Sequence, residues 1–354
     1  MAVTSPGRRL ADDLRDVADQ GVDTVDLAQR ALAGIRRHLG VDAAFIAAVD
    51  PTTLLFTQVL CQEQPLGNAQ AQLLHNEFTE ADVAKFRTVA TAHEPVEWLN
   101  RATSGEWQRS PRYRDILRPL GLGDELRLAL RTGKTCWAVM CLHRTAAAPA
   151  FTRLEARTLA MACRPLAHGA RRCALVRQID AGRATEGLPA LLVLDAAGKV
   201  VSRSEGAQRW LDEIAGSLPG PGDPLPAPVR TVIAALRGGR SAPRLRLQTR
   251  SGDWLSLHAT HLHGQADEQV AVIVEPAVAR EIAPIIVAAY ALTGRESDVL
   301  AAVLRGCSSR QIATALQISE HTVQDHLKSI FTKTDVRSRA ELASRVFADH
   351  YQPH

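Results

Sequence analysis

Segment 292–339 has the sequence LTGRESDVLAAVLRGCSSRQIATALQISEHTVQDHLKSIFTKTDVRSR, and its spacing predicts three short helices. Thr293, Ser308 and Ser319 each precede an apolar stripe of helical period, as N-cap residues do. A glutamate and a glutamine stand three residues after the first two caps, which is the spacing of a capping box. Only two residues separate the second helix from the third cap, and a connection of that length predicts a helix-turn-helix.

This segment resembles the LuxR-type helix-turn-helix, and the match continues in register through most of its length. The resemblance implies a compact all-α domain of four helices that binds DNA, with its third helix in the major groove. The positions that carry it are 292–296, Val299, Leu300, Gly306, Ile312, Ala313, Leu316, Ile318, Ser319, Thr322, Val323, His326, Lys333 and 336–339.

The outward face of the third helix carries the predicted DNA contacts. Amide, carboxylate and ammonium groups can each pair with a base edge or a phosphate. Asp325 stands where the family often has a basic or amide residue, and three roles stay open for it: to bind a base, to restrain Lys328 or to limit non-specific binding. The predicted DNA-binding residues are Ser319, His321, Thr322, Gln324, Asp325, Lys328, Lys333, Arg337 and Arg339.

Residues 278–354 contain nine Lys/Arg and eight Asp/Glu, a net charge of +1. A single copy with so little charge should bind DNA weakly, so two copies on adjacent half-sites are expected. A last helix is predicted over 340–347, and we expect a homodimer through Leu342, Val346 and Phe347 together with the domains before them. The alternative is that this stripe only packs under the first helix.

The chain before this segment divides into two α+β regions. Region 1–180 has an opening helix, a hairpin with its turn at Gly133, and a long closing helix from 151, and it resembles a GAF sensor domain. Region 185–276 has a strand pair, helices and three further strands, and it resembles a PAS domain more weakly. We expect 277–291 to be a linker and 292–354 to be the LuxR-type domain, so the fold class is multidomain.

Small-molecule binding is the expected role of the sensor regions, with a partner protein as the alternative. Trp98, Trp107 and Trp137 are candidates for the wall of an effector pocket, although tryptophan is more often simply part of a core. His261 and His263 would share one face of a strand, but no further ligand stands near them, so no metal or cofactor is predicted. Neither a phosphoreceiver pattern nor the Trp/Tyr/Asp cluster of an acyl-homoserine-lactone domain is found.

Composition supports this assignment by exclusion. The 354 residues carry a net charge of +4, which excludes a polybasic histone-like protein and an acidic tail. The six cysteines form no CxxC pair, and no signal peptide or apolar stretch of membrane-spanning length is present, so a cytoplasmic location is expected. An enzyme is not expected, because no nucleophile elbow or paired-carboxylate motif occurs.

The sequence therefore predicts a bacterial, sequence-specific DNA-binding transcription regulator controlled by its N-terminal domains. A scaffold that binds another regulator and uses DNA only as an address is the competing interpretation.

Overall fold

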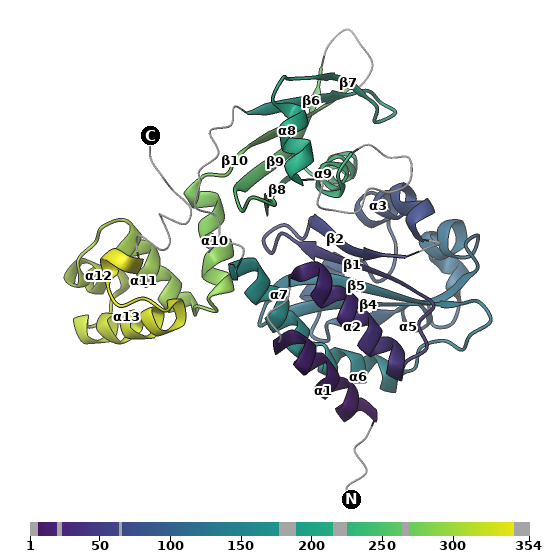
Figure 1. The fold of residues 1–354 in the computed structure, drawn as a ribbon, viewed down its shortest axis with the longest axis horizontal. Helices are drawn as coiled ribbons and strands as arrows, with labels where there is room; N and C mark the ends of the chain where they lie inside the picture. The colour runs from purple at the N-terminus through teal and green to yellow at the C-terminus, as the bar shows by residue number, and fades with distance from the viewer. Residues whose placement is uncertain are drawn as a thin grey trace, which may run out of the picture.

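The computed structural model describes residues 6–19, 23–63, 66–176, 189–214, 225–263 and 269–342. They form two sheet domains followed by a helical domain (Figure 1). This multidomain architecture of two α+β units and one all-α unit is the predicted one.

The first domain is built on a five-stranded antiparallel sheet in the order β2-β1-β5-β4-β3. The predicted hairpin forms its two longest strands, and its turn contains Gly133 with a φ of +61°, a conformation that favours glycine. The edge strands β2 and β3 are not among the predicted elements. The strands are β1 (Ala43–Val49), β2 (Phe56–Gln62), β3 (Val96–Trp98), β4 (Leu122–Thr132) and β5 (Thr135–Thr145).

Helices cover both faces of this sheet. Alternation along β4 and β5 decides which side chains each face buries: Leu126, Leu128 and Met140 pack against the terminal helices, whereas Ala129 and Cys141 belong to the opposite core. The terminal helices are α1 (Pro6–Asp19), α2 (Thr24–His38), α6 (Arg153–Ala162) and α7 (Arg164–Val176). The other face carries α3 (Gln70–Phe78) and α4 (Phe86–Thr91), and the short segments are η1 (Leu66–Ala69), α5 (Leu99–Ala102), η2 (Trp107–Arg109) and η3 (Tyr113–Leu117).

The closing helix is two helices rather than the single one predicted. Thr152 and Glu155 form the expected capping box at the start of α6. The helix stops at Cys163 and restarts as α7. Pro165 causes this break because it has no N–H to donate and its ring would clash with the carbonyl group one turn earlier in a continuous helix. A single apolar stripe therefore continues across a break in the backbone.

The second domain repeats the strand order of the first. Its five antiparallel strands lie in the order β7-β6-β10-β9-β8, with a core between the sheet and its two helices. The predicted sequence of strand pair, helices and three strands is confirmed. The elements are β6 (Ala190–Leu194), β7 (Val200–Arg203), α8 (Ala207–Ile214), α9 (Ala227–Arg237), β8 (Arg244–Gln248), β9 (Trp254–Leu262) and β10 (Gln269–Pro276).

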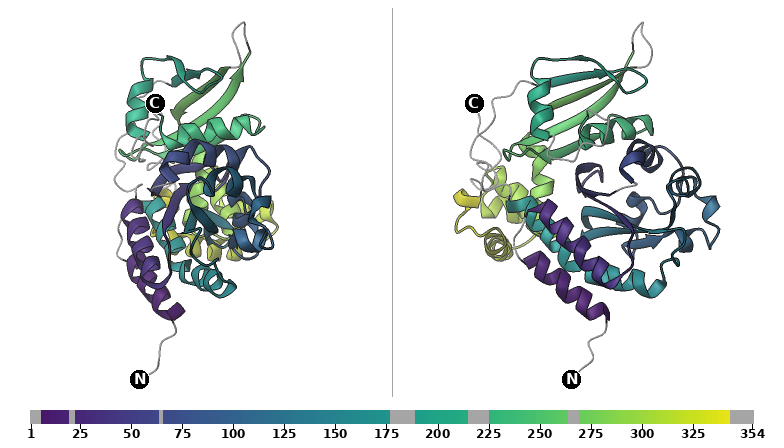
Figure 2. Two further views of the ribbon diagram at one scale, coloured as in Figure 1. Left: turned by 90° about the vertical axis from the view of Figure 1, so that its right-hand side faces the viewer. Right: turned by 45° about the vertical axis from the view of Figure 1, so that its right-hand side comes forward.

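The two sheet domains share an interface in which α9 lies over β2 and α3 (Figure 2). Leu55, from the first domain, is fully buried in the core of the second. The Asp50 carboxylate, also fully buried, accepts hydrogen bonds from the backbone N–H and the Nε of Arg246, both at 2.9 Å. The interface is therefore packed and ion-paired.

The predicted linker 277–291 is mostly a helix, α10 (Ala279–Ala289). Ile285 and Ala289 are buried in the core of the first domain, beside α7. Glu281, at the other end of the helix, pairs with Arg244 of the second domain. The connection to the helical domain is therefore held by both sheet domains rather than free.

The helical domain contains α11 (Gly294–Leu304), α12 (Ser309–Leu316) and α13 (Glu320–Thr334). The capping boxes predicted at Thr293 and Ser308 are both present. A further helix begins at 339, but most of the predicted span 340–347, including Val346 and Phe347, lies outside the described residues. Leu342 is fully buried in the core of this domain, as the alternative of packing within the domain requires, and its dimer role stays a prediction.

Within the described ranges, no helix is both long and apolar enough to cross a membrane.

Candidate functional site

The turn between α12 and α13 is closed by two local signals. Gln317 ends α12 in the left-handed conformation, with φ 55° and ψ 46°. Ser319 then caps α13, because its hydroxyl accepts a hydrogen bond from the backbone N–H of Thr322 at 3.0 Å. The hydroxyl groups of Ser319 and Thr322 also lie 2.9 Å apart. The helix-turn-helix is confirmed, and Ser319 and Thr322, which the sequence assigns to DNA, lie at the start of α13.

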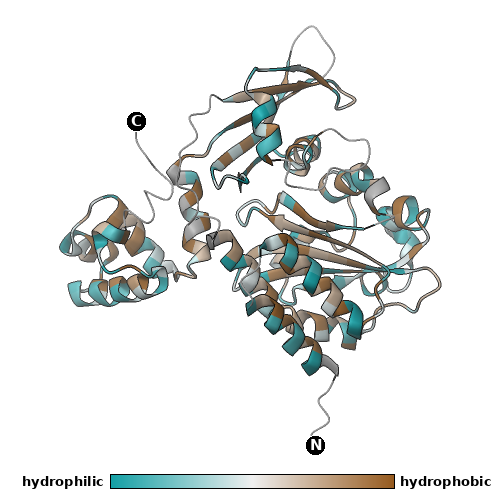
Figure 3. Ribbon diagram, viewed as in Figure 1, coloured by the Kyte–Doolittle hydropathy of each residue, from teal (hydrophilic) through white to brown (hydrophobic). Residues whose placement is uncertain are grey.

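Helix α13, the third helix of the domain, has one buried and one exposed face. Val323, Leu327 and Ile330 are buried in the domain core, as the spacing predicts. Hydrophilic residues cover the rest of α13 (Figure 3). The exposed side chains that the sequence assigns to DNA are His321, Gln324, Asp325 and Lys328.

Contacts within the domain already engage some of the predicted DNA residues. Gln324 Nε2 donates a hydrogen bond to the Ser309 hydroxyl at 2.9 Å, and Arg339 Nη2 donates to the same hydroxyl at 2.7 Å. Arg339 Nη1 also donates to the carbonyl of Cys307 at 3.1 Å. Arg339 therefore ties the chain after α13 to the start of α12.

Three more predicted residues differ in their surroundings. Lys333 Nζ lies 2.6 Å from the Glu296 carboxylate, which is almost fully buried, so this ammonium is an internal partner. Arg337 is exposed just after α13. The contact that the structure shows for Asp325 is with His321, 3.7 Å away and one helical turn earlier. The DNA roles of all these residues stay predictions.

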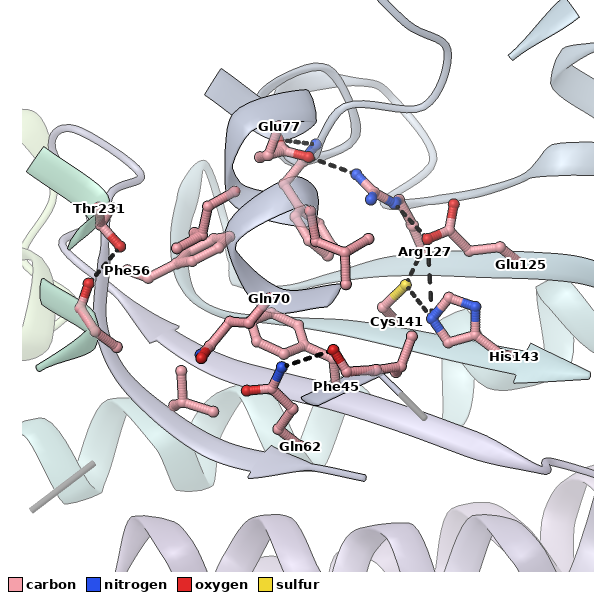
Figure 4. Close-up of a pocket in the computed structure, with 16 residues that line it drawn as sticks. Phe45, Phe56, Gln62, Gln70, Glu77, Glu125, Arg127, Cys141, His143 and Thr231 are labelled. Carbon is pink, nitrogen blue, oxygen red and sulfur yellow. Dashed lines mark hydrogen bonds and ion pairs between the residues drawn. The ribbon is translucent and has the colours of Figure 1, made fainter. Parts of the chain in front are cut away.

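A second candidate site is a small cavity inside the first domain, between the sheet and α3 and α4. Aromatic and aliphatic side chains, among them Phe45, Phe56 and Phe86, form its apolar walls. Thr231 of α9 closes it from the second domain (Figure 4), and Ala227 of the same helix also lines it. Its polar side chains include Glu77, Glu125, Arg127, Cys141 and His143.

Buried ion pairs hold the polar end of the cavity. Arg112 is fully buried, and its Nη2 lies 2.6 Å from Glu125 Oε2. Arg127 Nη1 lies 2.5 Å from Glu77 Oε2, and its Nε lies 3.1 Å from Glu125 Oε1. Burial alone would raise the pKa of Glu125, but the two guanidinium groups hold it well below its ordinary value. Glu125 is therefore ionised.

A thiol and an imidazole complete this polar end. Cys141 Sγ lies 2.8 Å from Glu125 Oε1 and 3.1 Å from His143 Nε2. Burial, reinforced by the adjacent carboxylate, raises the pKa of the Cys141 thiol well above its ordinary value. Burial also lowers the pKa of His143 to about 4. The thiol is therefore protonated and the imidazole neutral at pH 7.

The three tryptophans predicted for an effector pocket lie elsewhere in the first domain. Trp98 and Trp137 are buried in its core, and Trp137 lines a different cavity, at the junction with the second domain. Trp107 is half-buried and packs edge-on against Tyr113. Their ligand role stays a prediction. The cavity between the sheet and helices α3 and α4 is lined by other residues.

The histidines considered as metal ligands do not form a ligand cluster among the described residues. His263 is exposed just after β9, and His258, a third histidine on this strand, has its Nδ1 3.8 Å from Glu275 Oε1. The described ligand-type side chains that do converge are Glu125, Cys141 and His143, with all ligand atoms within 4.8 Å of one another. Sequence reasoning missed this group, although it occupies alternate positions on the predicted hairpin.

The fold and these two sites define a helix-turn-helix domain joined to a sheet domain with an internal cavity. Comparison with known families agrees: the family described as bacterial regulatory proteins, luxR family, matches residues 290–346, and the GAF domain family matches residues 23–169. The chain therefore carries a GAF domain and a luxR-family helix-turn-helix domain. The PAS assignment of 185–276 stays a prediction.

Curated relatives match short stretches of this chain. The monoamine regulon transcriptional regulator of Klebsiella aerogenes is 45% identical over 56 residues, which are 16% of this chain and 25% of the relative. The nitrate/nitrite response regulator protein NarP of Escherichia coli (strain K12) is 50% identical over 48 residues, 14% of this chain and 22% of the relative. The probable transcriptional regulatory protein SgaR of Hyphomicrobium methylovorum is 32% identical over 115 residues, which are 31% of this chain and 54% of the relative.

The chain thus spans between about a quarter and about half of the length of these relatives. A solved complex of Vibrio cholera VqmA with ligand and DNA aligns to 49% of this chain and 87% of that chain at 18% identity. Its TM-score of 0.22 is too low to bear on the fold or the function of this chain.

Proposed function

We propose that this protein is a sequence-specific DNA-binding transcription regulator whose GAF domain binds a small-molecule effector. The observation that carries the DNA-binding part is the exposed polar face of α13, supported by two capped helices in helix-turn-helix arrangement. Gln324 and Lys328, one turn apart on that face, present an amide and an ammonium group to a base edge or phosphate.

Two copies acting together suit this weakly charged domain. A net charge of +1 over residues 278–354 gives little general attraction to the phosphate backbone, so a single domain should bind with a modest salt dependence. Two domains that bind neighbouring half-sites would gain affinity through effective concentration. Because Leu342 is buried in the domain core, we propose that the dimer forms chiefly through other residues.

The cavity of the GAF domain is the proposed effector site. Its apolar walls would enclose the body of a small molecule, and its polar end would bind a hydrogen-bonding group. Because Ala227 and Thr231 of α9 contribute to the wall, a bound molecule would touch both sheet domains at once. We propose that this contact changes how α9 and α10 are held, and through α10 how the two DNA-binding domains are spaced.

Lys328→Ala in the full chain tests the DNA-binding part. We expect binding to an enriched duplex, measured by fluorescence anisotropy, to weaken by about 1–3 kcal/mol, or roughly 5- to 150-fold. Lys134→Ala is the matched control, because Lys134 is also exposed but lies on the β4–β5 turn. Equal affinities of both variants would contradict the role of α13.

Native mass spectrometry of the full chain, purified from its own host, tests the effector site. We expect an organic mass that is absent from Ala227→Phe, in which the new ring occupies the cavity wall. The same variant should retain its DNA-binding domain, judged by hydrogen exchange in α11 and α13. No organic mass in the unmodified protein, or an unchanged mass in Ala227→Phe, would overturn this part.

A further inference from the structure

Three electron-pair donors meet at the polar end of the cavity in the GAF domain. Cys141 Sγ lies 2.8 Å from Glu125 Oε1 and 3.1 Å from His143 Nε2, and those two atoms lie 3.9 Å apart (Figure 4). All three side chains are buried, with 1%, 3% and 1% exposure for Glu125, Cys141 and His143. Carboxylate, thiol and imidazole are ligand types that together suit a transition-metal ion.

The sheet itself positions the three groups. In the β4–β5 ladder Glu125 pairs with His143, and Arg127 pairs with Cys141, so the donors occupy neighbouring positions on one face. That face lines the cavity under α3 and α4. Two paired, central strands are a rigid support, which is what a preorganised metal site needs.

Contacts around the cluster leave the donors available on the cavity side. Arg112 binds Glu125 through Oε2, with 2.6 and 2.8 Å contacts, while Oε1 faces Cys141 and His143 and also lies 3.1 Å from Arg127 Nε. Nδ1 of His143 has no hydrogen-bond partner among the described residues, although the ring is almost fully buried. In the neutral imidazole the ring proton then sits on Nδ1, which leaves the lone pair of Nε2, on the side of Cys141 and Glu125, to coordinate an ion.

We propose that Glu125, Cys141 and His143 form a binding site for a divalent transition-metal ion such as Zn²⁺ or Fe²⁺, with the remaining coordination position open to the cavity. Tetrahedral coordination at ordinary bond lengths needs ligand atoms roughly 3.3–3.5 Å apart. The observed separations of 2.8, 3.1 and 3.9 Å bracket that value, so shifts of well under 1 Å complete the geometry. Binding replaces the thiol proton, which leaves to solvent as the thiolate coordinates the ion.

Charge around the site indicates what occupies the open position. Arg112 pairs with Asp82 and Glu125, and Arg127 pairs with Glu77 and Glu125. Lys85 donates to the Glu77 backbone carbonyl and feels the charges of Glu77 and Asp82, so three cations balance three carboxylates and the network without metal is neutral. A divalent ion with one thiolate adds a net charge of +1. A buried excess charge is unfavourable, so the fourth ligand should be an anion, with Arg127 beside it.

The metal site rests on the proposed effector cavity, but metal binding can be measured separately from effector binding. The full chain is reduced, stripped with a chelator and titrated with Co²⁺, which reports thiolate ligation through a charge-transfer absorption. We expect one equivalent per chain with that absorption, and the same stoichiometry for Zn²⁺ by elemental analysis. Cys141→Ser should lose the absorption, because an alcohol does not supply the sulfur band, while a hydroxyl keeps the space and hydrogen bonding.

Cys136→Ser is the matched control, because Cys136 is also a buried thiol on β5 but lies outside the cluster. It should keep the full absorption. Glu125→Gln, which preserves shape, should weaken Co²⁺ binding at least tenfold. Absence of the thiolate band in the unmodified protein, or its persistence in Cys141→Ser, would overturn the metal site. An organic mass found without metal would leave the effector proposal standing and refute this one.

Discussion

Replacing Lys333 by alanine should destabilise the helical domain rather than remove a DNA contact. Lys333 Nζ lies 2.6 and 2.9 Å from the two carboxylate oxygens of Glu296. That carboxylate also accepts hydrogen bonds from the Ser329 hydroxyl and the Thr293 backbone N–H, each at 2.6 Å. The pair therefore joins α13 to the capped start of α11.

The size of the effect follows from the pKa of Glu296. Burial opposes ionisation, but Lys333, Ser329 and Thr293 lower this pKa from 4.5 to about 2. At 1.36 kcal/mol per pH unit, the upper bound is about 3 kcal/mol. The Lys333 side chain is 32% exposed, so solvent screening reduces the expected loss to about 1–2 kcal/mol.

Hydrogen exchange of the full chain measures this loss directly. Amides in α11 and α13 should exchange about 5- to 30-fold faster in Lys333→Ala. Lys328→Ala is the control: its side chain is exposed on the same helix, so exchange should stay unchanged while DNA affinity falls. The reasoning is refuted if Lys333→Ala exchanges like the unmodified protein yet loses DNA affinity as Lys328→Ala does.

Three further predictions concern pH and the domain interface. The depressed pKa of Glu296 means that its stabilisation is present above pH 4.5 and is lost as pH falls through about 2; Glu296→Gln should flatten this dependence of exchange in α11. A Cβ at Gly238 would lie 2.0 Å from the carbonyl oxygen of Phe78, so Gly238→Ala should separate α9 from α3 and lower the melting temperature, and an unchanged value would refute the packing. Asp50→Ala leaves Arg246 without its carboxylate partner, so the free energy of opening measured by hydrogen exchange in β8 should fall by about 3 kcal/mol. Unaltered protection of the β8 amides would show that the ion pair is not stabilising.

The helical domain could be predicted from sequence because its signals are local. Thr293, Ser308 and Ser319 each mark a helix start within a few residues, and the stripes between them fix the buried faces. What sequence could not show is which polar side chains the domain uses for itself. Lys333 and Arg339 find partners in α11 and α12, which lie 37 and 30 residues earlier in the chain.

The cavity lay beyond sequence reasoning for a related reason. Its walls combine β1, β2, α3, β4 and β5 with α9, so residues more than 100 positions apart meet there. Alternation along the hairpin could have placed Glu125 and Arg127, or Cys141 and His143, on one face. The strand register, which pairs Glu125 with His143, is set by tertiary packing and completes the group only in three dimensions.

The central claim is that α13 recognises specific DNA sequence, and selection from a random duplex pool tests it most directly. The full chain should enrich a pair of related half-sites separated by about one helical turn, or a multiple of it. Lys328→Ala should alter or lose the preference at a base position within each half-site. The account would be contradicted if the unmodified protein enriched no sequence from the pool at a salt concentration that suppresses non-specific binding.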